Sequence, residues 1–315
     1  MEIRRDLRPA EPQHKGTAVT IGAYDGVHLG HRQVISELCR LAHQRGLVSA
    51  VVTFDRHPAS VVRPDSAPLL LTDLDQKLEQ LATTGVDLTQ VVTFDQERAD
   101  EDAEIFVSDV LVGCLGAQLI AVGEDFHFGH QRQGNVELLR RIGADLGFEV
   151  HALGLVGPDG ATARDHEQVS STFIRDALAR GDLDRANAML GRLYEVRGAV
   201  EHGDGRGREL GFPTANVRVD PSVLLPADGV YAGFYQRPDA TVYPAAISLG
   251  SRPHFYNDGG LLLEAYLLDA GCELYGETAS VRFTEFIRGQ QRFDSLDELV
   301  AQLQQDVEVT RGVTA

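Results

Sequence analysis

Residues 22–31 read Gly22-Ala23-Tyr24-Asp25-Gly26-Val27-His28-Leu29-Gly30-His31, so that one histidine lies on each side of Gly30. An apolar run at residues 18–22 leads into this stretch and indicates a short buried strand. Residues 32–45 follow it, and their apolar side chains recur at helical spacing. The stretch is therefore predicted to be a turn between a strand and an amphipathic helix, with its histidines at the start of the helix.

Strand and helix patterns continue to alternate through the rest of this half. Further strands are expected at residues 47–54, 90–94, 118–123 and 148–153, and helices at residues 102–115 and 136–146. The run at 47–54 is rich in valine and almost wholly apolar, which is typical of a strand covered on both faces. This alternation predicts an α/β domain with a doubly wound parallel sheet. In such sheets, ligands bind beyond the carboxyl ends of the strands.

The pattern changes near Leu190 to short alternating segments separated by Gly, Pro, Asn and Asp. Strands are expected at residues 194–200, 229–237, 243–249, 261–268 and 279–286, and a terminal helix at 295–307 with Ser295 as its N-cap. These segments predict a small antiparallel β-barrel. Two helices, at 171–179 and 183–190, are expected to close the first domain. The domains are therefore predicted to span residues 1–188 and 189–315.

Composition narrows the class of protein. The chain has 315 residues and a formal net charge of −18, which argues against nucleic acid and anionic membranes as partners. No apolar run is long enough to span a bilayer, and residues 1–16 lack the pattern of a signal peptide. The three cysteines are far apart and form no zinc-spaced cluster. We expect a reduced, cytoplasmic protein. The sequence leaves open whether the chain forms a homo-oligomer.

The histidine–glycine–histidine pattern has chemical meaning at a helix start. Gly30 allows the backbone to approach a ligand closely, and the helix N-terminus offers N–H groups to a phosphate. His28 and His31 add donors that can stabilise charge on a phosphorus centre during transfer. The alternative is a glycine-rich turn with two incidental histidines, and the strand–turn–helix context favours function.

A second phosphate-binding signal lies at Ser170-Ser171-Thr172-Phe173-Ile174-Arg175, which opens a predicted helix. Its hydroxyls and Arg175 can reach a triphosphate. Taken alone, this stretch is better explained as a capped helix.

The second half carries Gly203-Asp204-Gly205-Arg206-Gly207-Arg208-Glu209-Leu210-Gly211-Phe212-Pro213-Thr214-Ala215-Asn216. Its glycines suit a loop that folds over phosphates, although it lacks the Gly-Lys-Ser/Thr ending of a P-loop. Thr214 and Asn216 offer oxygens that suit magnesium. The alternative is a long hairpin loop with a proline turn.

Glu264 stands out in the otherwise apolar strand expected at 261–268. It is either solvated or held in a pocket. Period-two alternation places it on one face with Leu262, Tyr266 and Leu268. Because that face is apolar, a pocket is favoured and Glu264 is a candidate general base.

The motifs at residues 28–31 and 170–175 together resemble the HxGH and SSTxIR signatures of the nucleotidylyltransferase superfamily. Residues 123–129, Gly-Glu-Asp-Phe-His-Phe-Gly, and 54–58, Phe-Asp-Arg-His-Pro, are similar to loops of the FAD synthetase family. The resemblance implies that His28 and His31 contact ATP phosphates and carry the catalysis. The further nucleotide-binding residues that it implies are Gly22, Tyr24, Asp25, Gly30, Ser171, Thr172 and Arg175. The flavin-binding residues that it implies are His57, Pro58, Asp125, Phe126 and Phe128.

Residues 207–216, which read Gly-Arg-Glu-Leu-Gly-Phe-Pro-Thr-Ala-Asn, closely resemble the riboflavin kinase family, which is built on a small antiparallel barrel. This likeness implies that Gly205, Gly211, Thr214 and Asn216 bind the nucleotide, with Thr214 and Asn216 also holding Mg²⁺. It implies that Glu264 is the general base and that Arg288 contacts flavin. Nearly the whole chain, from about Ala18 to Asp306, thus resembles enzymes that convert riboflavin to FMN and FMN to FAD, with ATP as co-substrate.

Four residues depart from these family patterns. Tyr24 and Arg56 stand where Phe and Pro are usual, and His254 and Ala270 stand where Thr and Phe are usual. Neither Tyr24 nor Arg56 removes a group that the chemistry needs, and the effect of Arg56 and His254 on affinity stays open. Three alternatives remain open: an enzyme that retains one of the two activities, a flavin-binding protein without turnover, and an adenylyltransferase for another substrate.

Overall fold

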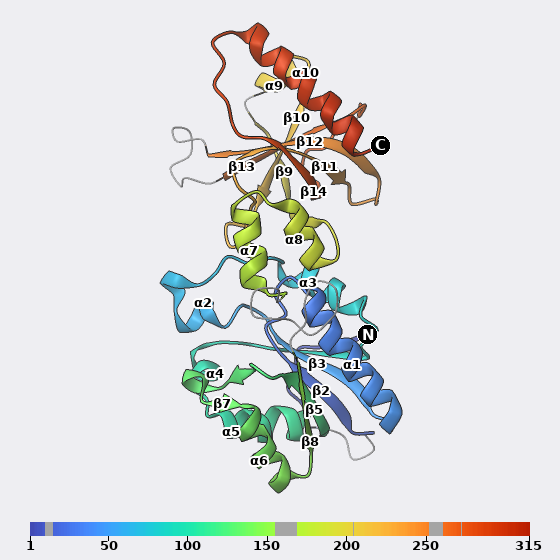
Figure 1. Cartoon of the computed structure of the whole chain (residues 1–315), viewed down its shortest axis with the longest axis vertical. Helices are drawn as coiled ribbons and strands as arrows, with labels where there is room; N and C mark the ends of the chain where they lie inside the picture. The colour runs from blue at the N-terminus through green and yellow to red at the C-terminus, as the bar shows by residue number, and fades with distance from the viewer. Residues whose placement is uncertain (10–14, 155–168, 204, 252–260, 272) are drawn as a thin grey trace. The chain divides into compact units, whose positions relative to one another are not determined.

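The computed structural model describes residues 1–9, 15–154, 169–203, 205–251, 261–271 and 273–315. The chain forms two compact units, Met1–Ser171 and Thr172–Ala315. The expected departure at His254 lies outside the described residues, as does Asp204 of the glycine-rich loop. Figure 1 labels the helices and strands of both units.

The first unit is built on a six-stranded sheet of order β1-β4-β3-β2-β5-β8, in which every pairing is parallel. The strands are β1 (Glu2–Arg4), β2 (Thr17–Ile21), β3 (Val48–Phe54), β4 (Leu88–Val92), β5 (Ala117–Gly123) and β8 (Glu149–Leu153). The predicted parallel sheet is confirmed. Sequence analysis did not anticipate β1, a three-residue edge strand of mostly exposed residues.

Helices cover both faces of this sheet, as a doubly wound fold requires. On one face, α1 (Leu29–Arg45) and α3 (Leu74–Ala82) pack on the strands, with Leu38 against Ala18 and Leu119. On the other face, the π-helix η2 (Val107–Cys114) and α6 (Val136–Leu146) pack against Val19 and its neighbours. The helix expected at 102–115 is thus formed in two pieces, because α5 (Ala103–Phe106) precedes η2.

Shorter elements connect these layers. They are α2 (Ala59–Val62), η1 (Pro64–Ser66), α4 (Gln96–Asp100), β6 (His127–Phe128), η3 (His130–Arg132) and β7 (Gly134–Asn135). The helix starts follow capping rules: Asp73 and Gln76 form a reciprocal capping box at α3. Gly46 ends α1 in the left-handed conformation that favours glycine.

The second unit is a closed antiparallel barrel of order β10-β13-β12-β11-β14-β9. Its strands are β9 (Tyr194–Glu201), β10 (Thr214–Val219), β11 (Gly229–Gln236), β12 (Val242–Ser251), β13 (Leu261–Leu267) and β14 (Thr278–Arg288). Large aromatic side chains fill its interior, including the fully buried Tyr231 and Phe283. The predicted small barrel is confirmed, with β10 as a strand that the sequence patterns did not indicate.

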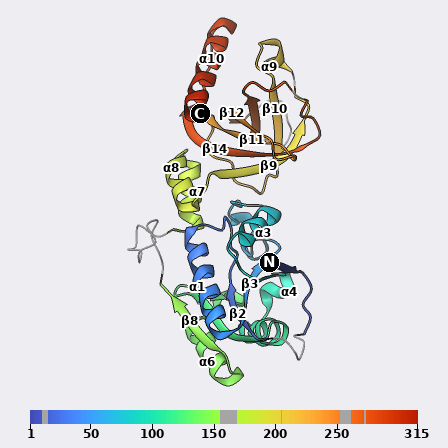
Figure 2. The same cartoon turned by 90° about the vertical axis from the view of Figure 1, so that its right-hand side faces the viewer.

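The remaining helices of the chain are α7 (Ser171–Ala179), α8 (Leu183–Leu190), α9 (Arg206–Glu209) and α10 (Leu296–Val313). The terminal helix α10 begins after its predicted cap Ser295, runs six residues beyond the predicted end at 307, and packs along β11, β12 and β14 (Figure 2). Helix α8 packs on β9 and β14, where Asn187 accepts from the Tyr194 N–H at 2.7 Å and donates to the Phe283 carbonyl at 3.1 Å. The predicted division of the chain at residue 188 stays a prediction.

Candidate active sites

A cavity of about 570 Å³ lies in the first unit, at the carboxyl ends of β2, β5 and β8. Strand order reverses at β2, which has β3 on one side and β5 on the other. A crevice of this kind is where open α/β sheets bind ligands. The predicted site residues that line the cavity are Gly22, Tyr24, His28, Gly30, His31, Asp125, Phe126 and Ser171.

The two histidines lie stacked at the entrance to α1. Their ring centroids are 3.5 Å apart with an interplanar angle of 18°. His28 is the N-cap of α1, and its Nδ1 accepts from the His31 N–H at 3.3 Å. A Cβ on Gly30 would lie 3.2 Å from the Val169 carbonyl oxygen and 3.3 Å from the His28 ring, which explains the glycine between the histidines.

His31 is electrostatically unusual. Burial lowers the pKa of His31 well below its ordinary value, and the charges of His28 and Lys77 lower it further. Its Nδ1 is buried and has no hydrogen-bond partner within the described part of the chain. At neutral pH, this imidazole is therefore uncharged and can stabilise an anion through an N–H dipole.

Tyr24 and Asp25 shape the turn before the histidines. The Tyr24 ring meets the edge of His31 at 5.0 Å, and its hydroxyl lies 2.7 Å from the Thr20 hydroxyl. The Asp25 carboxylate is 4% exposed and accepts from the backbone N–H of Leu71 at 2.9 Å. The backbone carbonyl of Asp25 accepts from the Ser171 hydroxyl at 2.9 Å. Asp25 thus joins three distant segments, and its contact with nucleotide stays a prediction.

The predicted flavin residues lie in three places. Asp125 and Phe126 line the main cavity. Phe128 does not line it; its ring stacks on Phe126 at 5.4 Å and packs against the hydrophobic core. His57 lines a smaller cavity, and its Nδ1 accepts from the N–H of Ala59 at 3.1 Å, next to Pro58 at the start of α2. Their flavin contacts stay predictions.

Thr172 and Arg175 lie in the first turns of α7, which belong to the second unit. Their predicted phosphate contacts therefore also stay predictions. One buried cation near the first cavity was missed by sequence analysis. Lys77 on α3 donates to the carbonyls of Ala23 and Phe54, at 3.3 and 2.7 Å.

A second cavity, of about 550 Å³, lies in the barrel unit against β10 and β13. Predicted residues Gly205, Thr214, Asn216 and Glu264 line it, whereas Gly211 does not. Asn216 on β10 is the register partner of Glu264 on β13. Since directly opposed residues of an antiparallel pair have neighbouring Cβ atoms, the amide and the carboxylate reach the same cavity.

Strand alternation explains the exposure of Glu264. Leu263 and Ala265 are fully buried and Leu267 is 5% exposed, because these side chains point into the barrel. Glu264 and Tyr266 lie on the opposite face and are half-buried. Glu264 therefore shares a face with Tyr266, as predicted, and the cavity covers that face.

The glycine-rich loop packs tightly on these groups. A Cβ on Gly203 would lie 2.2 Å from the Asn216 Nδ2, and one on Gly207 would lie 2.4 Å from the Phe212 carbonyl oxygen. Gly211 adopts φ 86°, a conformation that favours glycine, and so shapes the turn before β10. The loop therefore needs glycines in order to lie against β10.

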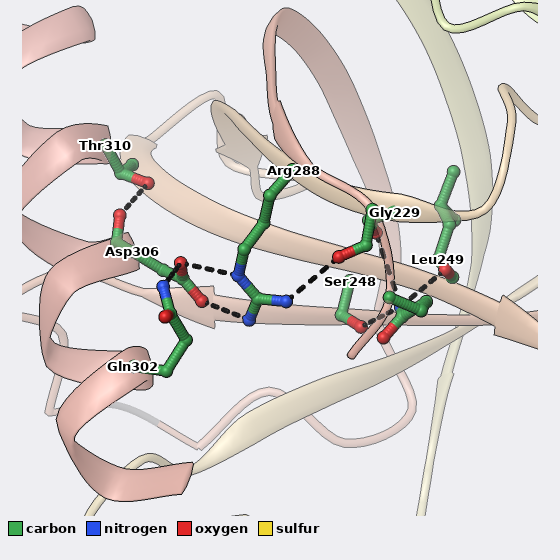
Figure 3. Close-up of polar contacts among 9 residues, drawn as sticks. Gly229, Ser248, Leu249, Arg288, Gln302, Asp306 and Thr310 are labelled. Atoms are coloured by element: carbon green, nitrogen blue, oxygen red, sulfur yellow. Dashed lines mark hydrogen bonds and ion pairs between the residues drawn. The ribbon is translucent and has the colours of Figure 1, made fainter. Parts of the chain in front are cut away.

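Arg288 forms an ion pair with Asp306 (Figure 3). Its Nε and terminal nitrogen donate to the two carboxylate oxygens of Asp306 on α10, at 2.9 and 2.6 Å. Gln302 donates to the same carboxylate at 2.9 Å, and the Thr310 hydroxyl donates to the Asp306 carbonyl at 2.8 Å. Arg288 does not line the second cavity. The pair fastens α10 to the end of β14, and the predicted flavin contact of Arg288 stays a prediction.

Substitution of Asp306 is expected to destabilise the barrel unit. Removing one partner of a buried ion pair leaves an uncompensated charge, so Asp306→Ala should lower the free energy of unfolding by about 3–5 kcal/mol. Arg311→Ala is the control, because the pair of Arg311 with Asp269 is exposed to solvent and contributes little to that free energy. Urea unfolding of the full chain measures both, and equal effects would contradict the prediction.

Each unit thus holds one cavity lined by residues for which phosphate chemistry was predicted, as expected of a transferase with two active sites. The family models agree: residues 10–173 match FAD synthetase and residues 190–314 match riboflavin kinase. The chain is 38% identical over 298 residues to the bifunctional riboflavin kinase/FMN adenylyltransferase of Listeria monocytogenes, covering 94% of this chain and 92% of that protein. It is 36% identical to the enzyme of the same name from Haemophilus influenzae, covering 99% of both chains. The chain belongs to the bifunctional riboflavin kinase/FMN adenylyltransferase family.

A solved structure shares the fold over its whole length. It is named as a macrolide-efflux protein from Streptococcus pneumoniae, is 29% identical, and has a TM-score of 0.85 over 99% of both chains. Among the helices that the structure describes, none is both long and apolar enough to cross a membrane. The likeness is one of fold.

Proposed function

We propose that the barrel cavity phosphorylates riboflavin and that the cavity at the sheet edge adenylylates FMN, each with the residues described above. Membership of the family supplies the two reactions, with ATP, riboflavin and FMN as substrates and FAD as the final product. The observation that carries the residue assignment is the register of β10 and β13. It places Asn216 opposite Glu264 at the cavity that the glycine-rich loop borders.

In the kinase step, Glu264 accepts the proton of the ribityl 5′-hydroxyl as that oxygen attacks the γ-phosphorus of ATP. The bond between the γ-phosphorus and the bridging oxygen breaks, and ADP leaves with FMN as the product. The half-buried position of Glu264 supports this role, since a cavity limits solvation of the carboxylate.

Magnesium fits the donor set of the second cavity. Thr214 offers a hydroxyl oxygen and Asn216 an amide oxygen, which are hard ligands of the kind that Mg²⁺ accepts. Within the described residues, no cluster of three His, Cys, Asp or Glu side chains could hold a metal alone. Thr214 and Asn216 would therefore hold the ion together with ATP. When bound, the ion neutralises charge on the phosphates.

In the adenylyl-transfer step, a phosphate oxygen of FMN attacks the α-phosphorus of ATP, and pyrophosphate leaves. His28 and His31 would donate to phosphate oxygens as negative charge redistributes. The N–H groups of the first turn of α1 add a favourable dipole. The stacked imidazoles at the cavity wall support this assignment, since both rings lie at the start of that helix.

A single reaction tests both steps. The purified chain is incubated with riboflavin, ATP and magnesium, and the three flavins are separated by chromatography over time. We expect FMN to appear first and FAD later. FMN without FAD would remove the adenylyltransferase assignment, and conversion of supplied FMN without use of riboflavin would remove the kinase assignment. No conversion of either flavin would favour a binding protein.

The glycine-rich loop gives a further prediction. Gly203→Ala should lower FMN formation about tenfold or more, because the new methyl group would displace the Asn216 amide. Conversion of FMN to FAD should remain unchanged. Gly271→Ala is the matched control, since Gly271 borders the same cavity and a Cβ there meets nothing within 4 Å. Rates of riboflavin phosphorylation at saturating ATP measure the difference, and an equal rate in both variants would contradict the prediction.

We also propose a cytoplasmic location, because both reactions consume ATP. The described cysteines Cys39 and Cys114 are free thiols, which suits a reducing compartment. Fractionation of cells followed by the FMN-forming assay tests this location.

A further inference from the structure

Lys77 lies almost fully buried at the carboxyl edge of the parallel sheet. It is 7% exposed and projects from the face of α3 that also buries Leu78 and Leu81. Its Nζ donates to the carbonyl of Ala23, in the turn after β2, and to that of Phe54, at the end of β3. One ammonium group thus joins the turn that leads to the histidine pair with the segment that leads to His57.

The choice of lysine is itself informative. The chain has 29 lysine and arginine residues, of which only Lys15 and Lys77 are lysines. Arginine serves at nearly every other cationic position, so the compact ammonium at 77 is an exception in this sequence. An ammonium has three N–H donors and can bind two carbonyls in a narrow space, whereas a guanidinium is larger and planar.

The surroundings of Lys77 are charged. Asp25 and Asp55 act on it from the two segments that it joins, and both raise its pKa. Burial outweighs them and lowers the pKa of Lys77 to about 8. Arg56 and His57 line the same small cavity, and His31 interacts with Lys77 electrostatically. A pKa lowered by burial means that the charged form opposes folding at neutral pH, since the unfolded chain binds the proton more tightly.

We propose that Lys77 is a positioning residue of FMN adenylylation, which holds the turn after β2 against the end of β3 and supplies a fixed positive charge next to His31. This inference rests on the proposed function of the first cavity. The charge of Lys77 helps to keep His31 uncharged, so that the imidazole acts on phosphate through a neutral N–H. Its two hydrogen bonds fix the backbone at the start of the turn that carries Tyr24, Asp25 and His28.

The test uses the full chain with Lys77→Met, Lys77→Arg and, as control, Lys15→Met. We expect Lys77→Met to lower kcat for FMN adenylylation about 100-fold, since small displacements of catalytic groups have effects of this size. The KM values should change less than threefold. Riboflavin phosphorylation by the same molecules should stay within twofold of wild type, as should both activities of Lys15→Met. Adenylylation by Lys77→Met within twofold of wild type would overturn the proposal.

The pH profile separates positioning from a merely structural role. For wild type, kcat/KM for ATP in adenylylation should fall as pH rises through about 8, because Lys77 then loses the charge that strengthens its hydrogen bonds to the two carbonyls. Lys77→Arg should keep at least a tenth of the activity and lose this fall, because a guanidinium stays charged. In Lys77→Met, the acidic limb should move to higher pH, since His31 gains basicity. Unchanged profiles in both variants would overturn the proposal.

A spectroscopic readout keeps the test independent of activity and of folding of the variants. Lysine labelled with ¹³C at Cε gives one signal for each of the two lysines, and Lys15→Met assigns them. We expect the Lys77 signal to titrate near pH 8. Titration of Lys77 at the ordinary value would overturn the proposal. If wild type forms no FAD, the proposed function fails, whereas this titration still reports on Lys77.

Discussion

His28→Ala is expected to lower the rate of FAD formation from FMN by about 10²–10³-fold, the cost of removing one preorganised donor from a site of developing charge. The geometry explains the size of the effect. Because Nδ1 of His28 accepts a backbone N–H, the neutral ring carries its proton on Nε2 and can donate that proton in a hydrogen bond. FMN formation in the barrel unit should be unaffected.

Loss of capping must be separated from loss of catalysis in this experiment. His28 is also the N-cap of α1, and replacing a cap by alanine costs about 1 kcal/mol. His28→Asn supplies the control, because asparagine caps helices well but lacks the imidazole. Both variants should lose FAD formation to a similar extent, while His28→Asn keeps the thermal stability of wild type. Recovery of activity in His28→Asn would show that capping alone explains the effect, and an equal loss of FMN formation would contradict separate sites.

Glu264→Gln is expected to lower FMN formation by about 10²–10⁴-fold, the usual contribution of a general base. Glutamine keeps the size and hydrogen-bonding oxygen of the side chain but cannot accept a proton at neutral pH. Conversion of supplied FMN to FAD should continue at the wild-type rate. Single-turnover formation of FMN at saturating riboflavin and ATP is the measurement, because it isolates the chemical step.

A matched carboxylate on another strand serves as the control. Glu285 lies exposed on β14 and does not line the second cavity. Glu285→Gln should therefore change FMN formation less than twofold, although it removes the same charge from the same unit. A wild-type rate in Glu264→Gln would exclude Glu264 from the mechanism, and loss of both activities would indicate a folding defect.

Sequence patterns revealed the architecture where side-chain periodicity was strong. The parallel sheet follows from apolar runs such as residues 47–54, which form β3 almost as expected. Strand β10 was missed because it begins inside the motif Pro213–Asn216, whose proline and asparagine indicate a loop. Its alternation was present, since Ala215 and Val217 are buried, but six residues give a weak signal.

Residues of the candidate sites could be predicted where they belong to a recognisable sequence motif. His28, His31, Asn216 and Glu264 could be found because their neighbours form recognisable strings. Lys77 could not, because a charged residue in a helix pattern is usually solvated and burial depends on the strands beside it. Arg288 illustrates the same limit, since its partner Asp306 lies 18 residues away on another element.

The link between the Asp25 carbonyl and the Ser171 hydroxyl has a consequence for synthesis of the chain. The two residues are 146 positions apart, and the sheet is complete at Leu153. During translation, all six strands of the first unit emerge from the ribosome before Ser171 does. Domains fold as they emerge, so a nascent chain from which β8 has left the ribosome and Ser171 has not should contain the sheet but lack this wall of the first cavity. The first cavity is therefore completed only when the start of α7 has been synthesised.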